Sequence, residues 1–211
     1  LHVTALTVVS GIAIYYFKYV HLNEPLTTAA MLILLVTAMV FIPVSVLVSK
    51  KIGKKAVYGF GMFVFSSGTM VLFFCGHLYD VSFSLMTMFF TGIGMGLTYA
   101  MPYAMVPDAV EYDYLKTGER SEGAFYGIWT FGIKIGQAVA LGISGAVLSL
   151  SGYIPDVIQT PQALLGIRLL LGPIPAVIFF LALIALYCYP INEARYNEIL
   201  EGIKEMESRS R

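Results

Sequence analysis

The sequence predicts an all-α membrane protein with six transmembrane helices. Of its 211 residues, 58% are hydrophobic and only 12% are charged, which is about half the charged fraction of an ordinary soluble domain. The apolar residues form six runs that can each cross a bilayer, which takes roughly 20 mostly apolar residues. Lysine and arginine gather in alternate connections between these runs, a pattern typical of chains that cross a membrane repeatedly.

Short polar breaks separate the six runs. We predict spans at residues 1–20, 26–49, 56–75, 83–107, 122–150 and 165–189. Residues 1–190 then form a six-helix transmembrane bundle, and the polar residues 191–211 form a tail that is helical along or beyond the membrane surface. A soluble protein with a buried apolar core is a poorer explanation, because its helices rarely run this long in series.

Four of the predicted spans are recognised mainly by the residues at which they begin or end. The run at 1–20 opens with no basic leader and no small-residue cleavage site, so we expect an internal piece of a longer chain rather than a signal peptide. The run at 26–49 has no charged residue and stops at a group of lysines. The run at 56–75 follows those lysines, and the run at 165–189 leads into the polar tail.

The span at 83–107 contains residues suited to a bend and to a binding wall. Pro102 can free a backbone carbonyl and kink the helix, which transporters use at gates. Tyr99 lies nine residues before Asp108, which places it near the middle of the bilayer. Its ring could stack on a sugar or could simply pack, and spacing alone favours packing.

The span at 122–150 carries a charge near its middle. Lys134 lies about twelve residues into the run, and a cation at that depth costs roughly 3 kcal/mol unless it faces water or a partner. Tyr126, Thr130, Lys134 and Gln137 recur at spacings of three and four, which puts them on one polar stripe. No acidic residue lies at the centre of a predicted span. We therefore expect Lys134 either to pair with a carboxylate from outside this chain or to face a functional, water-filled cavity.

Basic residues predict the orientation. Ten of them lie in the connections 50–55 and 108–121 and in the tail, whereas the other three connections have none. Because cytoplasmic loops retain positive charge, the C-terminus is predicted to be cytoplasmic. The net charge of zero gives no reason to expect nucleic acid as a partner. The ten residues are Lys50, Lys51, Lys54, Lys55, Lys116, Arg120, Arg195, Lys204, Arg209 and Arg211.

The connection 108–121 crowds charges of both signs into a short stretch, with Asp108, Glu111 and Arg120 inside it and Glu122 just beyond. Ion pairs within the connection, pairs with another part of the protein and a plain solvated loop are all compatible with this pattern. Pairs that form in one conformation and break in another would bias a gate, since an equilibrium shifts only through differential interactions.

The stretch that surrounds these charges resembles a known family. Residues 107–123 (PDAVEYDYLKTGERSEG) and then 125–137 (FYGIWTFGIKIGQ) closely resemble the signature of the glycoside–pentoside–hexuronide:cation symporters. These are the melibiose-permease group of the major facilitator superfamily. Residues 51–55 (KIGKK) resemble part of the superfamily's loop motif in degenerate form. The resemblance covers essentially the whole chain and implies that the six spans are helices 7–12, the C-terminal bundle of a twelve-helix transporter.

The resemblance also implies roles for particular residues. The family's lysine in helix 11 falls on Lys134, next to the sugar and cation sites. Positions that line the family's sugar site fall on Trp129, Thr130 and Ile133, and Gln137 on the same helix completes the predicted substrate site. The family's aromatic residue in helix 10 falls on Tyr99. The predicted cytoplasmic gate consists of Asp108, Glu111, Arg120 and Glu122.

The function implied by the resemblance is symport of a sugar or glycoside coupled to Na⁺ or H⁺, by alternating access of two six-helix halves. The coupling ion would be bound mainly by the N-terminal half, so this chain is expected to need that half, the lipid bilayer and a small-molecule substrate as partners. We expect a bacterial inner-membrane location, and neither a cofactor nor a metal site in this half.

Three alternatives remain at this point. A sodium-coupled symporter of lysolipids or other amphiphiles shares this architecture and a lysine in helix 11. A non-transporting membrane scaffold is the second alternative. A membrane-embedded enzyme is the weakest, because the sequence has no His-Glu cluster, no Gly-x-Ser-x-Gly and no paired carboxylates at membrane depth.

Overall fold

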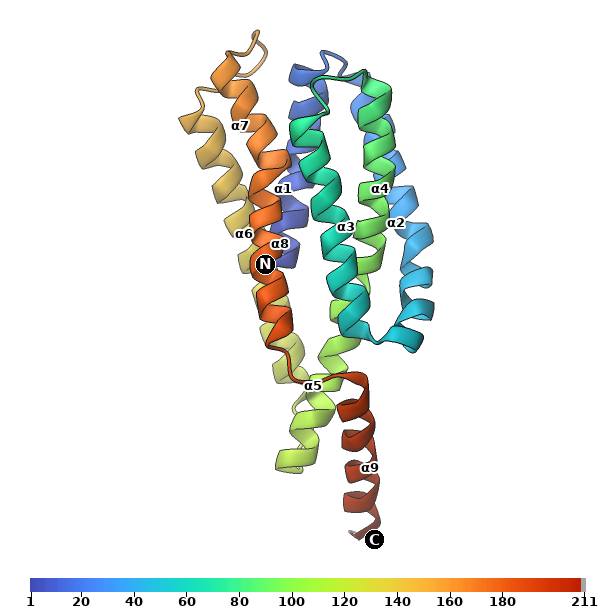
Figure 1. The fold of residues 1–211 in the computed structure, drawn as a ribbon. Coiled ribbons are helices and arrows are strands. Elements are labelled where there is room, and N and C mark those ends of the chain that lie inside the picture. Colours follow the sequence, from blue (N-terminus) through green and yellow to red (C-terminus); the bar gives the residue numbers. More distant parts are fainter. Residues whose placement is uncertain (210–211) are drawn as a thin grey trace.

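The computed structural model of the protein describes residues 1–209, and its helices stand side by side in one bundle (Figure 1). Six helical segments are long and apolar enough to cross a membrane, and the prediction of an all-α, six-span fold is confirmed. The first three spans are α1 (His2–Tyr15) continued by the π-helical η1 (Tyr16–Val20), then α2 (Pro25–Ile52) and α3 (Lys54–Phe74). The other three are α4 (Val81–Tyr99) with α5 (Met101–Thr117), α6 (Glu122–Leu150), and α7 (Pro161–Leu171) with α8 (Pro173–Tyr187).

A further helix, α9 (Glu193–Arg209), projects beyond the bundle alongside the last turns of α5 (Figure 1). Ile191, Ile199 and Ile203 are buried there against Tyr112 and Leu115 of α5. We call this the α9 end of the bundle and the opposite end the far end. Arg211, one of the basic residues used to predict the orientation, lies outside the described residues.

Two spans are each interrupted once, at a proline. The fourth span breaks at Ala100 because Pro102 lies in the first turn of α5, where its missing N–H leaves no helical hydrogen bond unmade. The bend predicted at Pro102 is therefore present. The sixth span breaks at Gly172, directly before Pro173, for the same reason.

The prediction that residues 108–121 form a loop is wrong. α5 remains helical to Thr117 and ends at Gly118, whose φ of 74° is the left-handed conformation that favours glycine. Among its mixed charges this helix also has apolar residues that are covered, since Val110 is buried and Leu115 packs against α9. Asp108 and Glu111 are thus helical residues, and the connection to α6 consists only of residues 118–121.

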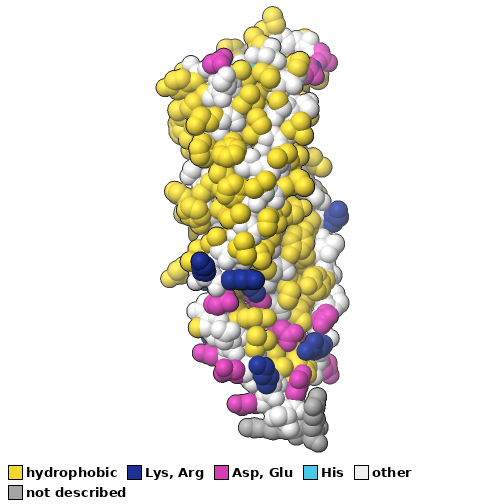
Figure 2. Space-filling view, turned by 90° about the vertical axis from the view of Figure 1, so that its right-hand side faces the viewer, with side chains coloured by type: hydrophobic (Ala, Val, Ile, Leu, Met, Phe, Trp, Pro, Cys, Tyr) yellow, Lys and Arg dark blue, Asp and Glu magenta, His cyan; other side chains and the backbone are white. Residues whose placement is uncertain are grey.

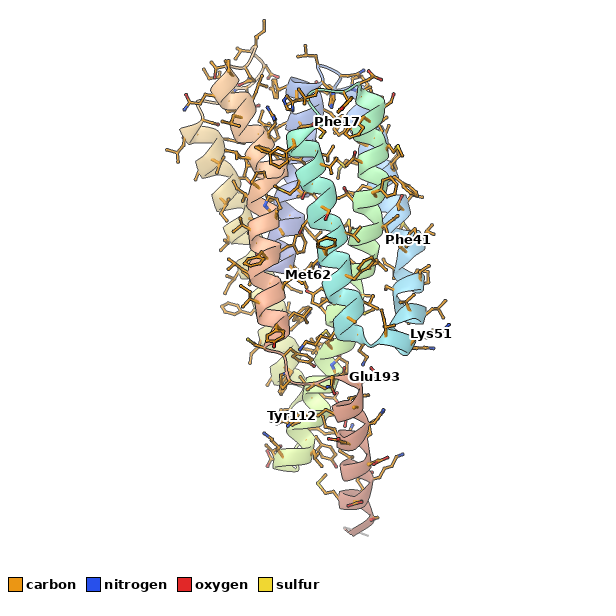
Figure 3. All side chains as sticks on the ribbon, in the orientation of Figure 1. Phe17, Phe41, Lys51, Met62, Tyr112 and Glu193 are labelled. Atoms are coloured by element: carbon orange, nitrogen blue, oxygen red, sulfur yellow. The ribbon has the colours of Figure 1, made fainter. Side chains whose placement is uncertain are left out.

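Close backbone contact fixes the packing of α4 between α2 and α3. A side chain at Gly92 would lie 2.7 Å from the carbonyl oxygen of Leu34, and one at Gly96 would lie 2.6 Å from that of Ala38. These glycines therefore allow α4 to pack closely against α2. Buried side chains such as Phe17, near the end of the bundle opposite α9, and Met62 fill the interior between the helices (Figure 3).

Helix α6 is the least covered of the spans. Only Gly136 and Ala140 of its 29 residues are buried, and Gly136 is the point where α6 approaches Thr4 of α1. Its remaining residues are exposed or partly exposed, including most of the predicted substrate site.

Candidate functional site

A cavity of about 510 Å³ opens between α1, the junction of α4 and α5, and α6. Four of the six predicted substrate residues line it. Tyr99 ends α4, whereas Trp129, Ile133 and Gln137 lie on successive turns of α6. The four residues lie up to 38 positions apart in the sequence. The fold brings them to one cavity because α6 follows α5 through a short connection and packs against α1.

Aromatic rings form one side of this cavity. The ring of Tyr99 lies 6.2 Å from that of Tyr103, and Tyr103 meets Trp129 edge-on at 5.9 Å. Tyr99 is 46% exposed, so its ring is available to a ligand. The indole N–H of Trp129 is buried and has no hydrogen-bond partner among the described residues. Buried indole N–H groups are normally paired, so this donor is a polar group that the described residues leave unsatisfied.

The two other predicted substrate residues, Thr130 and Lys134, lie outside the cavity. They are four residues apart on α6, and the face they share is exposed and adjoins the face of Ile133 and Gln137. The Lys134 Nζ donates to the Gln137 Oε1 at 3.4 Å, which links the charge to the cavity wall. None of the described acidic residues forms an ion pair with Lys134.

Residues that the sequence analysis missed supply other polar groups of the cavity. Thr7 and Ser10 of α1 carry hydroxyl groups into its lining, and Tyr103 of α5 adds a phenol. Thr7 and Ser10 lie three positions apart within an apolar run, a spacing that places them on one helix face. That interruption of the first apolar run was the signal that could have identified them.

Three of the four predicted gate residues form a cluster at the α9 end. Arg120 lies in the turn between α5 and α6, and its guanidinium is 3.8 Å from the carboxylates of both Glu111 and Glu122. Its charge also lies 4.7 Å from the ring of Tyr114. The cluster therefore joins the end of α5 to the start of α6.

The fourth predicted gate residue, Asp108, takes a different partner. Both of its carboxylate oxygens accept hydrogen bonds from the Lys54 Nζ of α3, at 2.6 and 2.8 Å, and only 5% of the residue is exposed. Lys54 was missed as a site residue, although it belongs to the degenerate loop motif at 51–55. The ring of Tyr196 in α9 lies 4.7 Å from the Lys54 Nζ, so α9 covers this ion pair.

Two tyrosines near Asp108 have raised pKa values because they are partly buried. Burial, and then the nearby negative charge of Asp108, raises the pKa of Tyr189 to about 12. Its hydroxyl donates to the backbone carbonyl of Met105 at 3.3 Å. The same two causes, in the same order, raise the pKa of Tyr196. Both phenols are therefore neutral at physiological pH.

Comparison with known proteins agrees with this architecture. The sequence model of the family described as MFS/sugar transport protein matches residues 1–193. The chain therefore belongs to this family of the major facilitator superfamily, and it is an integral membrane protein of the transporter class rather than an enzyme.

Three proteins are similar to this chain over more than nine-tenths of its length. The chain is 32% identical to the glucuronide carrier protein homolog of Escherichia coli K12 over 196 residues, which are 92% of this chain and 43% of that protein. It is 33% identical, over 92% of this chain and 41% of the relative, to a protein of Salmonella typhimurium LT2 provisionally named a sulfoquinovose importer. An uncharacterized symporter of Bacillus subtilis, YjmB, is 29% identical over 96% of this chain and 44% of its own length. The chain thus spans less than half the length of these relatives.

Proposed function

We propose that this chain is the C-terminal half of a cation-coupled symporter for a sugar or glycoside. The observation that carries the proposal is the cavity between α1, α4–α5 and α6, because it combines exposed aromatic rings with hydroxyl and amide groups. Stacking on aromatic rings and hydrogen bonds to a few placed polar groups are what a small polyhydroxylated ligand requires. Its volume of about 510 Å³ lies within the range of small-molecule sites.

The names of two relatives narrow the proposed substrate. A glucuronide carries a carboxylate and sulfoquinovose carries a sulfonate, so both are sugars with an anionic group. Lys134, which adjoins the cavity through Gln137, would supply the complementary positive charge. We therefore propose a sugar with an anionic substituent as the substrate.

The mechanism we propose is alternating access. An N-terminal six-helix half would cover the exposed faces of α6 and complete the cavity, and its acidic residues would bind most of the coupling Na⁺ or H⁺. The cluster of Arg120, Glu111 and Glu122 would form part of a gate, with the α9 end facing the cytoplasm of a bacterium. The alternation of basic and non-basic connections supports that orientation.

The test is uptake by the full-length carrier reconstituted in proteoliposomes. We expect an inward Na⁺ or H⁺ gradient to drive accumulation of labelled phenyl glucuronide or sulfoquinovose, and unlabelled sugar acids to compete. Competition by lysophosphatidylcholine alone would favour an amphiphile symporter. Uptake that does not respond to either gradient would exclude cation coupling.

A further inference from the structure

The turn between α2 and α3 gathers four lysines within six residues at the α9 end. Gly53 alone separates the two helices, and its φ of 86° permits this abrupt turn. Lys50 and Lys51 lie in the last turn of α2, which ends at Ile52, while Lys54 and Lys55 begin α3. We propose that Lys50 and Lys51 form a binding site for the headgroup of an anionic phospholipid, a role separate from the proposed transport.

Two of the four lysines bind partners within the protein. Lys54 is paired with Asp108, as described above. Lys55 donates to the carbonyl oxygens of Tyr187, the last residue of α8, at 2.9 Å and of Tyr189 just beyond it at 2.8 Å. These bonds hold the turn against α5 and α8, so the position of the neighbouring lysines is fixed by the fold.

The other two lysines have no such partner. Lys50 and Lys51 are exposed, and neither forms an ion pair with a described residue. No aspartate or glutamate occurs between residues 25 and 74, so α2 and α3 supply no compensating charge. In the space-filling view, basic side chains, with acidic ones next to them, gather where the apolar body ends (Figure 2), and Lys51 lies at the tip of α2 (Figure 3).

The surface next to these lysines is suited to acyl chains. Leu47 is 63% exposed and Ile52 58% exposed on α2, three positions before Lys50 and one after Lys51. A lysine at the end of such a surface can extend its charge to the headgroup level while its stem stays in the apolar layer. A phospholipid can place its anionic headgroup against the two lysines and its acyl chains against the apolar surface. Free phosphate can bind only the lysines.

The proposed effect has a size that can be measured. Each lysine close to an anionic membrane surface contributes about a fivefold gain in binding, so the pair should contribute about 30-fold. We therefore expect the Lys50→Gln/Lys51→Gln carrier to bind phosphatidylglycerol about 30-fold more weakly than the wild type. The Lys50→Arg/Lys51→Arg carrier should keep most of the binding, because it keeps the charge.

The experiment is native mass spectrometry of the full-length carrier released from nanodiscs of phosphatidylcholine and phosphatidylglycerol. Retained phosphatidylglycerol should fall in the glutamine variant and should not fall in Lys204→Gln, a matched exposed lysine on α9. Inorganic phosphate should not displace the lipid. Equal retention in the wild type and the glutamine variant, or equal loss in Lys204→Gln, would overturn the proposal. Circular dichroism of each variant shows that the fold is kept.

Discussion

Lys54 and Asp108 lie 54 residues apart in the chain, yet their side chains meet at 2.6 Å. The carboxylate is almost fully buried, whereas a quarter of the lysine side chain remains exposed. A buried charge that loses its partner is costly, so the two ends of this pair should respond differently to substitution. The sequence pattern indicated Asp108 as a gate candidate. It could not indicate that Lys54, two helices away, is the partner of Asp108.

We predict that Lys54→Ala destabilises the full-length carrier more than Asp108→Ala. Lys54→Ala leaves a buried carboxylate unpaired and should cost roughly 3 kcal/mol, whereas Asp108→Ala leaves a lysine that can reach water. The double variant should be more stable than Lys54→Ala alone. The measurement is thermal unfolding in detergent for all four proteins. Equal losses in the two single variants would contradict the burial asymmetry.

A second residue-scale prediction concerns His21 at the far end. Its Nε2 lies 2.8 Å from the Ser84 hydroxyl, and burial lowers the pKa of the imidazole below its ordinary value of 6.5. As the pH falls through about 6.5, the unfolded chain therefore takes up this proton before the folded one does, and stability decreases.

The check is the unfolding temperature at about pH 7.5 and about pH 5.5. We expect the His21→Gln carrier to lose less stability than the wild type over this range. The opposite order would mean that the folded state favours the imidazolium.

At the scale of helices, the run lengths of apolar residues predicted all six spans, because a bilayer sets a minimum length that the sequence displays directly. The extent of α5 could not be predicted in this way. Its last turns carry Asp113 and Lys116, and their helical conformation depends on packing against α9, a contact between segments about 80 residues apart. A contact at the far end was equally unpredictable from the sequence. Lys18 of η1 forms an ion pair at 2.8 Å with Asp156, which lies in the connection between α6 and α7.

The close packing of α4 gives a prediction at this scale. Gly92→Ala should destabilise the carrier by about 1–3 kcal/mol, because the added methyl group would meet the Leu34 carbonyl and the Thr37 side chain of α2. The matched control is Gly59→Ala on α3, where the added atom would make only ordinary van der Waals contacts, 3.6 Å from Leu183 and 3.7 Å from Leu186. Thermal unfolding compares the two. Because alanine is the better helix former, Gly59→Ala should lose no stability, and a loss as large as that in Gly92→Ala would contradict the packing explanation.

At the scale of the whole molecule, the bundle has an open face along α6 and a closed core around α1. Tyr99, Trp129 and Ile133 could be predicted as cavity residues because the family resemblance marked them, and Gln137 because it lies on the polar stripe of Lys134. Thr7 and Ser10 are marked only by their spacing within an apolar run, and their contribution depends on how α1 packs beside α6. No motif marks Tyr103 of α5. We propose that Lys134, which lies on the open face and donates to Gln137, connects this half to the rest of the carrier.

The most direct test of this account is cation-driven accumulation of a labelled sugar acid by the full-length carrier with Lys134→Ala. A residue that holds a charge-assisted contact at membrane depth should contribute about 1.5–3 kcal/mol, so we predict that accumulation falls about tenfold or more. Lys204→Ala on α9 is the matched control and should accumulate substrate as the wild type does. Accumulation at the wild-type level by Lys134→Ala would contradict the account.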